Sequence, residues 1–191
     1  MCRKYDDVSF DDVDFAHLQL LQCKKRIATV KRDLYIGEDI SNPHNISPED
    51  LSESGATLAP NITISDCQIC VELAAKAIFK TVGVNPVERH EISFNHERVT
   101  DLLNRLPSDS DLSKRVPRVI FLTQFWERFY TLSKYGVPER NISSFELLNE
   151  SDALRAVQDA DYCIDTAEEL IDLVISEKEI DRADLSFPGL I

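Results

Sequence analysis

The feature that most constrains the fold is a helical repeat of apolar residues in four long segments of the chain. Apolar side chains recur every three or four positions across residues 15–40, 64–82, 117–135 and 150–175. That spacing gathers them on one side of an α-helix, and no segment alternates polar and apolar residues as a half-buried strand does. The sequence therefore predicts an all-α fold, arranged as an up-and-down bundle of four to five main helices.

Residues that favour helix ends stand beside these segments. Gly83 is placed to end the second segment and Gly136 the third, because glycine readily adopts the left-handed conformation that closes a helix. Asn149 is a suitable cap for the last helix, since its side chain can accept a hydrogen bond from a free backbone N–H. A shorter helix is expected over residues 96–106, where Pro107 stops it.

The chain is long enough for one ample core at 191 residues, and we expect residues 1–191 to form a single helical domain. Residues 41–61 are rich in Ser, Pro, Asn and acids, which predicts a polar loop insertion with a capped start for one short helix at Ser47. Residues 176–191 form a C-terminal tail that ends in the apolar string LSFPGLI. The sequence leaves open whether this tail packs on the bundle or on a partner.

The segment RVIFLTQFWERFYTLSKY, residues 118–135, is rich in aromatic side chains. Its apolar residues follow the spacing of a core-facing helix, namely Phe121, Leu122, Phe125, Trp126, Phe129 and Leu132. We expect such a helix to be buried on most of its circumference, so Arg128 in its last turns needs an ionic partner, water or a ligand. The aromatic side chains supply more apolar surface than one flank of a small bundle commonly hides, which predicts a homodimer through this helix or the face beside it.

Three parts of the sequence occur in a characteristic order. The first, CQICVELAAKAIFKTVGVNPVERHEI over residues 67–92, carries a glutamate and lysines on one helix face and then a basic residue and a histidine in a loop, which are Glu72, Lys76, Lys80, Arg89 and His90. The aromatic segment follows, and then a long acidic amphipathic helix over residues 150–175. Together they resemble the HEPN superfamily, named for nucleotide binding in higher eukaryotes and prokaryotes, across residues 62–175. The resemblance implies a helical bundle that binds RNA or nucleotides and dimerises with the Arg128 regions of two chains adjacent.

The end of the aromatic helix carries the part of the resemblance that concerns chemistry. In ribonucleolytic members of the family, an arginine is followed four to six residues later by histidine and then, two residues on, often by tyrosine. Arg128 and Tyr135 match this pattern, but Ser133 stands at the histidine position. Cleavage of RNA uses a group that exchanges a proton near neutral pH while an arginine stabilises the phosphorane charge, and serine does not titrate there. The resemblance therefore implies catalytic positions at Arg128 and Tyr135 in a degenerate site for a metal-independent endoribonuclease.

Two functions from different classes follow from these observations. In the first, the chain binds RNA or nucleotides with little or no cleavage, as a component of a toxin–antitoxin or defence-type system. In the second, it is a non-enzymatic dimeric module that has kept the bundle and regulates a nucleotidyltransferase-type partner protein. The single residues also have plainer interpretations, because Arg128 can be a stacked or ion-paired packing residue and Tyr135 a helix-end anchor with its hydroxyl in water.

The charge of the chain limits how it can meet a nucleic acid. A formal charge of −13 repels polyanions on average, so any phosphate contact must be local. Basic residues concentrate at residues 24–32 and at Lys114, Arg115 and Arg118. These side chains are either solvated or, for the second cluster, supply phosphate contacts beside Arg128. The acidic residues of the last helix are expected to form a solvated face.

The cysteines and histidines do not indicate a metal centre. Cys67 and Cys70 form a CxxC, but no second pair stands at zinc-ligand spacing, so we expect both to be small core residues rather than zinc ligands or a redox pair. His90 and His96 lack a third ligand at such spacing. We therefore expect no metal and no cofactor.

The sequence also predicts a location. It has no run of 18 apolar residues, so no helix that spans a membrane is expected. The N-terminus, MCRKYDDVSFDD, is too acidic and polar for a signal or transit peptide. We expect a cytoplasmic protein whose five cysteines are reduced.

Overall fold

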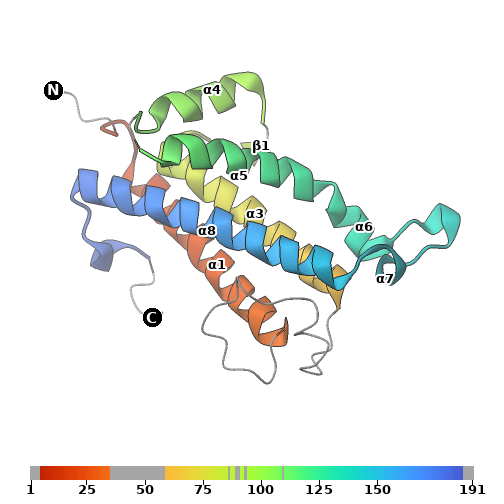
Figure 1. The fold of residues 1–191 in the computed structure, drawn as a ribbon. Helices are drawn as coiled ribbons and strands as arrows, with labels where there is room; N and C mark the ends of the chain where they lie inside the picture. The colour runs from red at the N-terminus through yellow and green to blue at the C-terminus, as the bar shows by residue number, and fades with distance from the viewer. Residues whose placement is uncertain are drawn as a thin grey trace.

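The structure is a computed structural model, and it describes residues 5–34, 59–85, 87–88, 91–92, 94–108 and 110–186. Its helices are α1 (Phe10–Leu34), α3 (Pro60–Thr81), α4 (His96–Arg105), α5 (Leu112–Glu127), α6 (Phe129–Tyr135), α7 (Ser144–Leu147) and α8 (Glu150–Lys178). Two short strands, β1 (Val87–Glu88) and β2 (Glu91–Ile92), pair antiparallel before α4. The predicted all-α helical bundle is confirmed, as Figure 1 shows.

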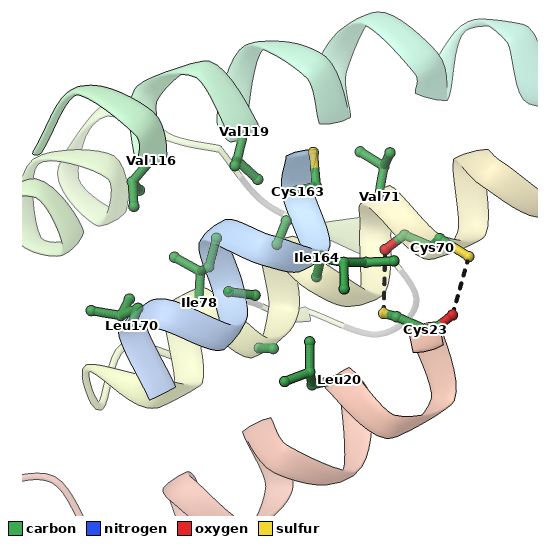
Figure 2. Packing of buried hydrophobic residues seen from close by; sticks show 14 of the residues in the cluster. Leu20, Cys23, Cys70, Val71, Ile78, Val116, Val119, Cys163, Ile164 and Leu170 are labelled. Carbon is green, nitrogen blue, oxygen red and sulfur yellow. Dashed lines mark hydrogen bonds between the residues drawn. The ribbon is translucent and has the colours of Figure 1, made fainter. Parts of the chain in front are cut away.

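Helix α3 lies at the centre of the bundle and packs against α1, α5, α6 and α8. Small buried residues on α3, among them Ala74, Ala75 and Ala77, let neighbouring helices approach closely. Figure 2 shows the core at this crossing, with Leu20 from α1 and side chains from α3, α5 and α8. The site described below stands on α5 and α6, which lie along α3.

Capping residues place several helix ends where the sequence predicts them. The Asn149 side chain accepts a hydrogen bond of 3.1 Å from the Asp152 backbone N–H, and Asp152 accepts one from the Asn149 backbone N–H, so the two form a capping box that begins α8. Asn95 caps α4 in a related way, because its side chain accepts a hydrogen bond of 2.9 Å from the Arg98 backbone N–H. Helix α3 begins at Pro60, not at Ile64, because proline is well suited to the first turn of a helix. The last two residues of the predicted 41–61 loop are therefore helical.

Two expectations for α1 and the loop fall partly outside the described residues. Helix α1 begins at Phe10 rather than at residue 15. The Ser9 hydroxyl oxygen caps it by accepting a hydrogen bond of 3.1 Å from the Asp12 backbone N–H. The short helix predicted to begin at Ser47, and residues 41–58 of the predicted loop, lie outside the described ranges.

The segment predicted as one helix over residues 117–135 is two helices. Helix α5 begins at Leu112 with Pro117 inside it, because the buried Leu112 anchors the first turn and Asp111 O accepts hydrogen bonds from the N–H groups of the first turn. The regular pattern is interrupted at Arg128 and resumes in α6. Arg128 keeps near-helical dihedral angles, φ −65° and ψ −25°, so the side-chain directions of α5 continue into α6.

A compact hairpin joins α6 to α7. Gly136 adopts φ 65°, and a Cβ atom there would lie 2.3 Å from Ile142 O, so only glycine fits this turn. Val137 and Ile142 exchange backbone hydrogen bonds of 2.8 and 3.2 Å. The Asn61 amide at the start of α3 donates to Ser144 Oγ at 3.3 Å. These contacts fix the end of α6, and with it Tyr135.

The described part of the C-terminal tail packs on the bundle. Helix α8 continues to Lys178, and Leu185 is buried. The Ser186 backbone N–H and hydroxyl donate to the two carboxylate oxygens of Asp14 at 2.6 and 2.7 Å. The question that the sequence left open is thus answered for Leu185 and Ser186, whereas residues 187–191 are outside the described part of the chain.

Candidate nucleic-acid interface

One face of α5 presents basic and aromatic side chains to solvent. At about 100° per residue its members fall within an arc of about 80°, and all are exposed. Phe121 and Phe125 are 52% and 40% exposed, which is unusual for such large apolar side chains. We call this set the basic–aromatic face, and it consists of Lys114, Arg118, Phe121, Phe125 and Arg128.

The expectation that the aromatic helix is buried on most of its circumference is wrong. Leu122 and Trp126 are buried, but Phe121 and Phe125 are exposed. The helix has two apolar sides, and only one of them meets α3 and α8. Apolar spacing alone does not tell which of two adjacent apolar stripes has a neighbouring helix to cover it.

The aromatic rings of this region support one another. Phe121 and Phe125 stack with ring centroids 6.2 Å apart, and Phe125 contacts Trp126 edge-on at 5.1 Å and Phe129 at 5.2 Å. The Arg118 guanidinium lies 5.0 Å from the Phe121 centroid, a cation–π contact. The rings therefore form a continuous ladder along α5 and the start of α6, with the Arg118 cation at one end.

The face is locally basic in an acidic chain. Residues 112–135 contain five basic residues against one acid, Glu127, a formal charge of +4 in a chain of −13. Arg115 is neutralised, because it pairs with Glu169 and lies over the Tyr162 ring. Three cations of the face have no ion-pair partner among the described residues, and these are Lys114, Arg118 and Arg128.

The three positions of the family motif do not lie on one side of the helix. Arg128 is exposed at the junction of α5 and α6, whereas Ser133 is 1% exposed and its hydroxyl donates to Tyr130 O at 3.0 Å. Five residues of helix separate their directions by about 140°. Tyr135 is 66% exposed, and seven residues of helix bring it within about 20° of the direction of Arg128. The structure thus places Arg128 and Tyr135 on one side and Ser133 in the interior.

A buried carboxylate joins α8 to this region. Asp159 Oδ2 accepts hydrogen bonds from the Trp126 indole Nε1–H at 3.1 Å and from Arg155 Nε–H at 3.2 Å. Asp159 is buried although the sequence suggested a solvated acidic face, and the buried Asp161 is paired with Lys31 at 2.8 Å. Sequence reasoning missed Arg155; its spacing of four residues from Asp159 was the available signal.

The basic run on α1 has a structural use. Lys24 pairs with Glu168, Arg26 pairs with Asp66 at 2.5 Å, and Lys31 pairs with Asp161. These pairs hold α1 against α3 and α8, so this cluster offers less free charge to a phosphate than the basic–aromatic face does.

The charged residues of α3 that the family resemblance singled out are engaged in pairs. Lys76 pairs with Glu72 at 2.5 Å one turn away, and Lys80 pairs with Asp12 of α1 at 3.0 Å. Arg89 and His90 lie outside the described residues. No contact between this group and the basic–aromatic face is found among the residues whose placement is described.

The CxxC cysteines are core residues, as expected. Cys67 and Cys70 are buried with free thiols. The Cys70 thiol donates to Cys23 O at 3.7 Å and the Cys23 thiol to Cys70 O at 3.4 Å (Figure 2). Burial raises the pKa of the Cys70 thiol to about 12, which makes it a poor nucleophile and metal ligand.

Other possible sites are not found in the described part of the chain. It has no group of three or more His, Cys, Asp or Glu residues arranged to hold a metal ion. His96 is exposed, and His90 is among the residues that are not described. None of the described helices has both the length and the apolar character needed to cross a membrane.

Comparison with known proteins identifies the family. Searches of curated proteins and of solved structures give no match. The family model of the HEPN domain matches residues 46–180. Because this match spans more than half of the 191 residues, the chain belongs to the HEPN domain family.

Proposed function

We propose that this HEPN protein binds RNA or nucleotides through its basic–aromatic face and has a degenerate ribonuclease site around Arg128. Family membership supports a nucleotide- or RNA-related role. The observation that carries the proposal is the set of three cations on the face that have no ion-pair partner among the described residues, in a chain whose net charge repels polyanions. Arginines of this kind make strong charge-assisted hydrogen bonds to phosphate.

The loss of catalysis is supported by the environment of Ser133. This residue is buried, and its hydroxyl is used in a hydrogen bond to Tyr130 O. A residue that neither titrates near neutral pH nor reaches the surface cannot serve as a general acid or base. The absence of such a group typically lowers a rate by about two to four orders of magnitude, whereas phosphate binding by Arg128 does not depend on it.

A homodimer is supported by the spacing of exposed residues along α5 and α6. Phe121, Arg128 and Tyr135 recur every seven residues, and all three are exposed. A seven-residue repeat is the pattern by which two helices pack along one another, and HEPN domains often dimerise. We propose that two copies associate along the line of Phe121, Arg128 and Tyr135, with Phe125 left accessible at its edge, so that the Arg128 residues of both chains line one binding site.

Cleavage and mass measurements test this proposal. We expect the wild type and Arg128→Ala to leave a mixed RNA pool uncut in the presence of a metal chelator. Robust cleavage by the wild type that Arg128→Ala abolishes would overturn the degenerate-site proposal. Light scattering should give twice the 21.7 kDa chain mass, and Phe121→Ser should lower that mass. A constant monomer mass over a wide concentration range would contradict the dimer.

We place such a binding protein in a toxin–antitoxin or defence-type system, on the strength of the family resemblance alone. The second candidate function is a non-enzymatic module that regulates a nucleotidyltransferase-type partner. It is favoured by three exposed apolar or aromatic side chains on α3, α6 and α7, because Tyr135, Phe145 and Ile62 are 66%, 65% and 57% exposed. This second function predicts that the wild type and Arg128→Ala have equal affinity for RNA, and that Phe145→Ala loses binding to the partner.

A further inference from the structure

Arg155 of α8 stands next to the aromatic ladder of α5. Its Nε–H donates to Asp159 Oδ2 at 3.2 Å, and the Trp126 indole donates to the same oxygen at 3.1 Å. The Trp126 ring in turn contacts Phe125 at 5.1 Å and Phe129 at 5.3 Å. A single buried carboxylate oxygen thus orients both the ladder and a cation from the neighbouring helix.

The binding end of Arg155 is available. A guanidinium has five N–H donors, and the contact with Asp159 uses only the one on Nε. The terminal nitrogens have no hydrogen-bond partner in the described part of the protein, and the side chain is 58% exposed. The planar fork that matches a phosphate is therefore presented to solvent, while its stem is held in place.

Arg155 and Arg128 flank the ladder from opposite sides. Arg128 follows Trp126 by two residues, which turns it about 160° away from the side of α5 that meets Arg155 and Asp159. Phe125 points between these two directions, 60° from Arg128. An RNA strand that lies across the exposed Phe125 ring would therefore contact one cation on each side.

The charge on Asp159 goes beyond what Trp126 needs. An indole N–H requires one acceptor, and the neutral oxygen of an asparagine would supply it. A buried carboxylate is costly unless a cation accompanies it. Its presence is explained by the second donor, because the negative charge fixes the Arg155 guanidinium that a neutral amide would hold weakly.

We propose that Arg155 is a further phosphate-binding residue of the basic–aromatic face, and that Asp159 is its positioning residue. This inference rests on the proposed function and extends its site from α5 to α8. The ligand class is a phosphate of the RNA strand or nucleotide that contacts Arg128 and Phe125.

The test is a titration of the wild type and variants with a short unstructured RNA at several salt concentrations. Arg155→Ala should weaken binding about tenfold at low salt and reduce the slope of log K against log salt by about 0.7, the value for one lost single-strand phosphate contact. Arg155→Gln removes the positive charge but keeps an N–H donor for Asp159, so it should lower the affinity and the slope as Arg155→Ala does. It replaces Arg155→Ala in the test if the alanine variant folds poorly. Arg140→Ala removes an exposed arginine in the hairpin and should leave the affinity within about twofold.

The positioning role of Asp159 is tested by a double-mutant comparison. Asp159→Asn keeps an acceptor for Trp126, so the native emission of this single tryptophan should persist. In that background the effect of Arg155→Ala should shrink to about twofold, because Arg155 is no longer held. An undiminished effect would overturn the role of Asp159.

The outcomes separate this inference from the proposed function. If Arg128→Ala weakens RNA binding while Arg155→Ala and Arg155→Gln match Arg140→Ala in affinity and slope, Arg155 is not part of the site and the proposed function stands. If the wild type binds no RNA or nucleotide at low salt, both proposals are wrong. Quenching of Trp126 emission by RNA that Arg155→Gln reduces would support the inference independently of affinity.

Discussion

Arg128 and Ser133 face opposite sides of the junction between α5 and α6. Arg128 is exposed, while Ser133 is buried with its hydroxyl bonded to Tyr130 O. The position at which the family resemblance implies a histidine is therefore a packing position in this chain. Restoring a catalytic group would require the end of α6 to change its packing against α3.

This relationship predicts the effect of Ser133→His. The larger imidazole has no room in the interior, and overpacking of this kind typically costs about 1–3 kcal/mol. We expect a lower thermal unfolding midpoint and no gain of ribonuclease activity. Thr131→His, at an exposed position of the same helix, is the control and should leave the midpoint almost unchanged. A stable Ser133→His variant that cleaves RNA would show that the position reaches the site.

The hairpin after α6 makes a second prediction, for Gly136→Ala. The new Cβ atom would lie 2.3 Å from Ile142 O, and the backbone would keep φ 65°. Strain and clash together should cost more than about 2 kcal/mol, measured by denaturant unfolding. Gly83→Ala is the matched control, because its φ is also positive but its nearest neighbour, Val8 Cγ2, is 3.4 Å away. Equal losses for the two variants would show that the hairpin packing is not tight.

Tyr5 gives a prediction about pH. Burial, with a smaller effect of Glu177, raises the pKa of its phenol from 10.0 to about 12. The folded state therefore holds this proton more tightly than the unfolded chain does, and the stability from this difference is present below pH 10 and is lost as the pH rises towards 12. Tyr5→Phe should flatten this decline, whereas Tyr135→Phe, at an exposed position, should not.

The same variant tests the buried hydroxyl at neutral pH. Tyr5 Oη is buried without a hydrogen-bond partner in the described structure. Its removal should therefore be neutral or stabilise the fold by about 1 kcal/mol. A marked loss of stability on Tyr5→Phe, or pH profiles identical to the wild type between pH 10 and 12, would contradict this account.

The sequence allowed the helices to be predicted, because local signals determine them. The 3.6-residue period and the Asn149 cap act within one or two turns, and both are found in the structure. The apolar pattern predicts a start at residue 117, but α5 begins at Leu112, whose buried side chain extends the helix before Pro117.

Contacts between helices were beyond a sequence-based prediction. The exposure of Phe125 depends on which helices lie beside α5, and periodicity carries no such information. Asp159 accepts hydrogen bonds from Trp126 and Arg155, and the first of these joins residues 33 positions apart in the sequence. Arg128 and Tyr135 follow the spacing of a family motif, whereas the four-residue spacing of Arg155 from Asp159 indicates only an ion pair within one helix.

The measurement that tests the central claim most directly is the affinity of a short single-stranded RNA for the wild type, Arg128→Ala and the control Arg140→Ala at low salt. A charge-assisted hydrogen bond contributes about 1.5–3 kcal/mol, so Arg128→Ala should weaken binding by about ten- to a hundredfold. Arg140→Ala should bind almost as the wild type does. Equal affinities for all three proteins would contradict the assignment of Arg128 as the phosphate-binding residue of this face.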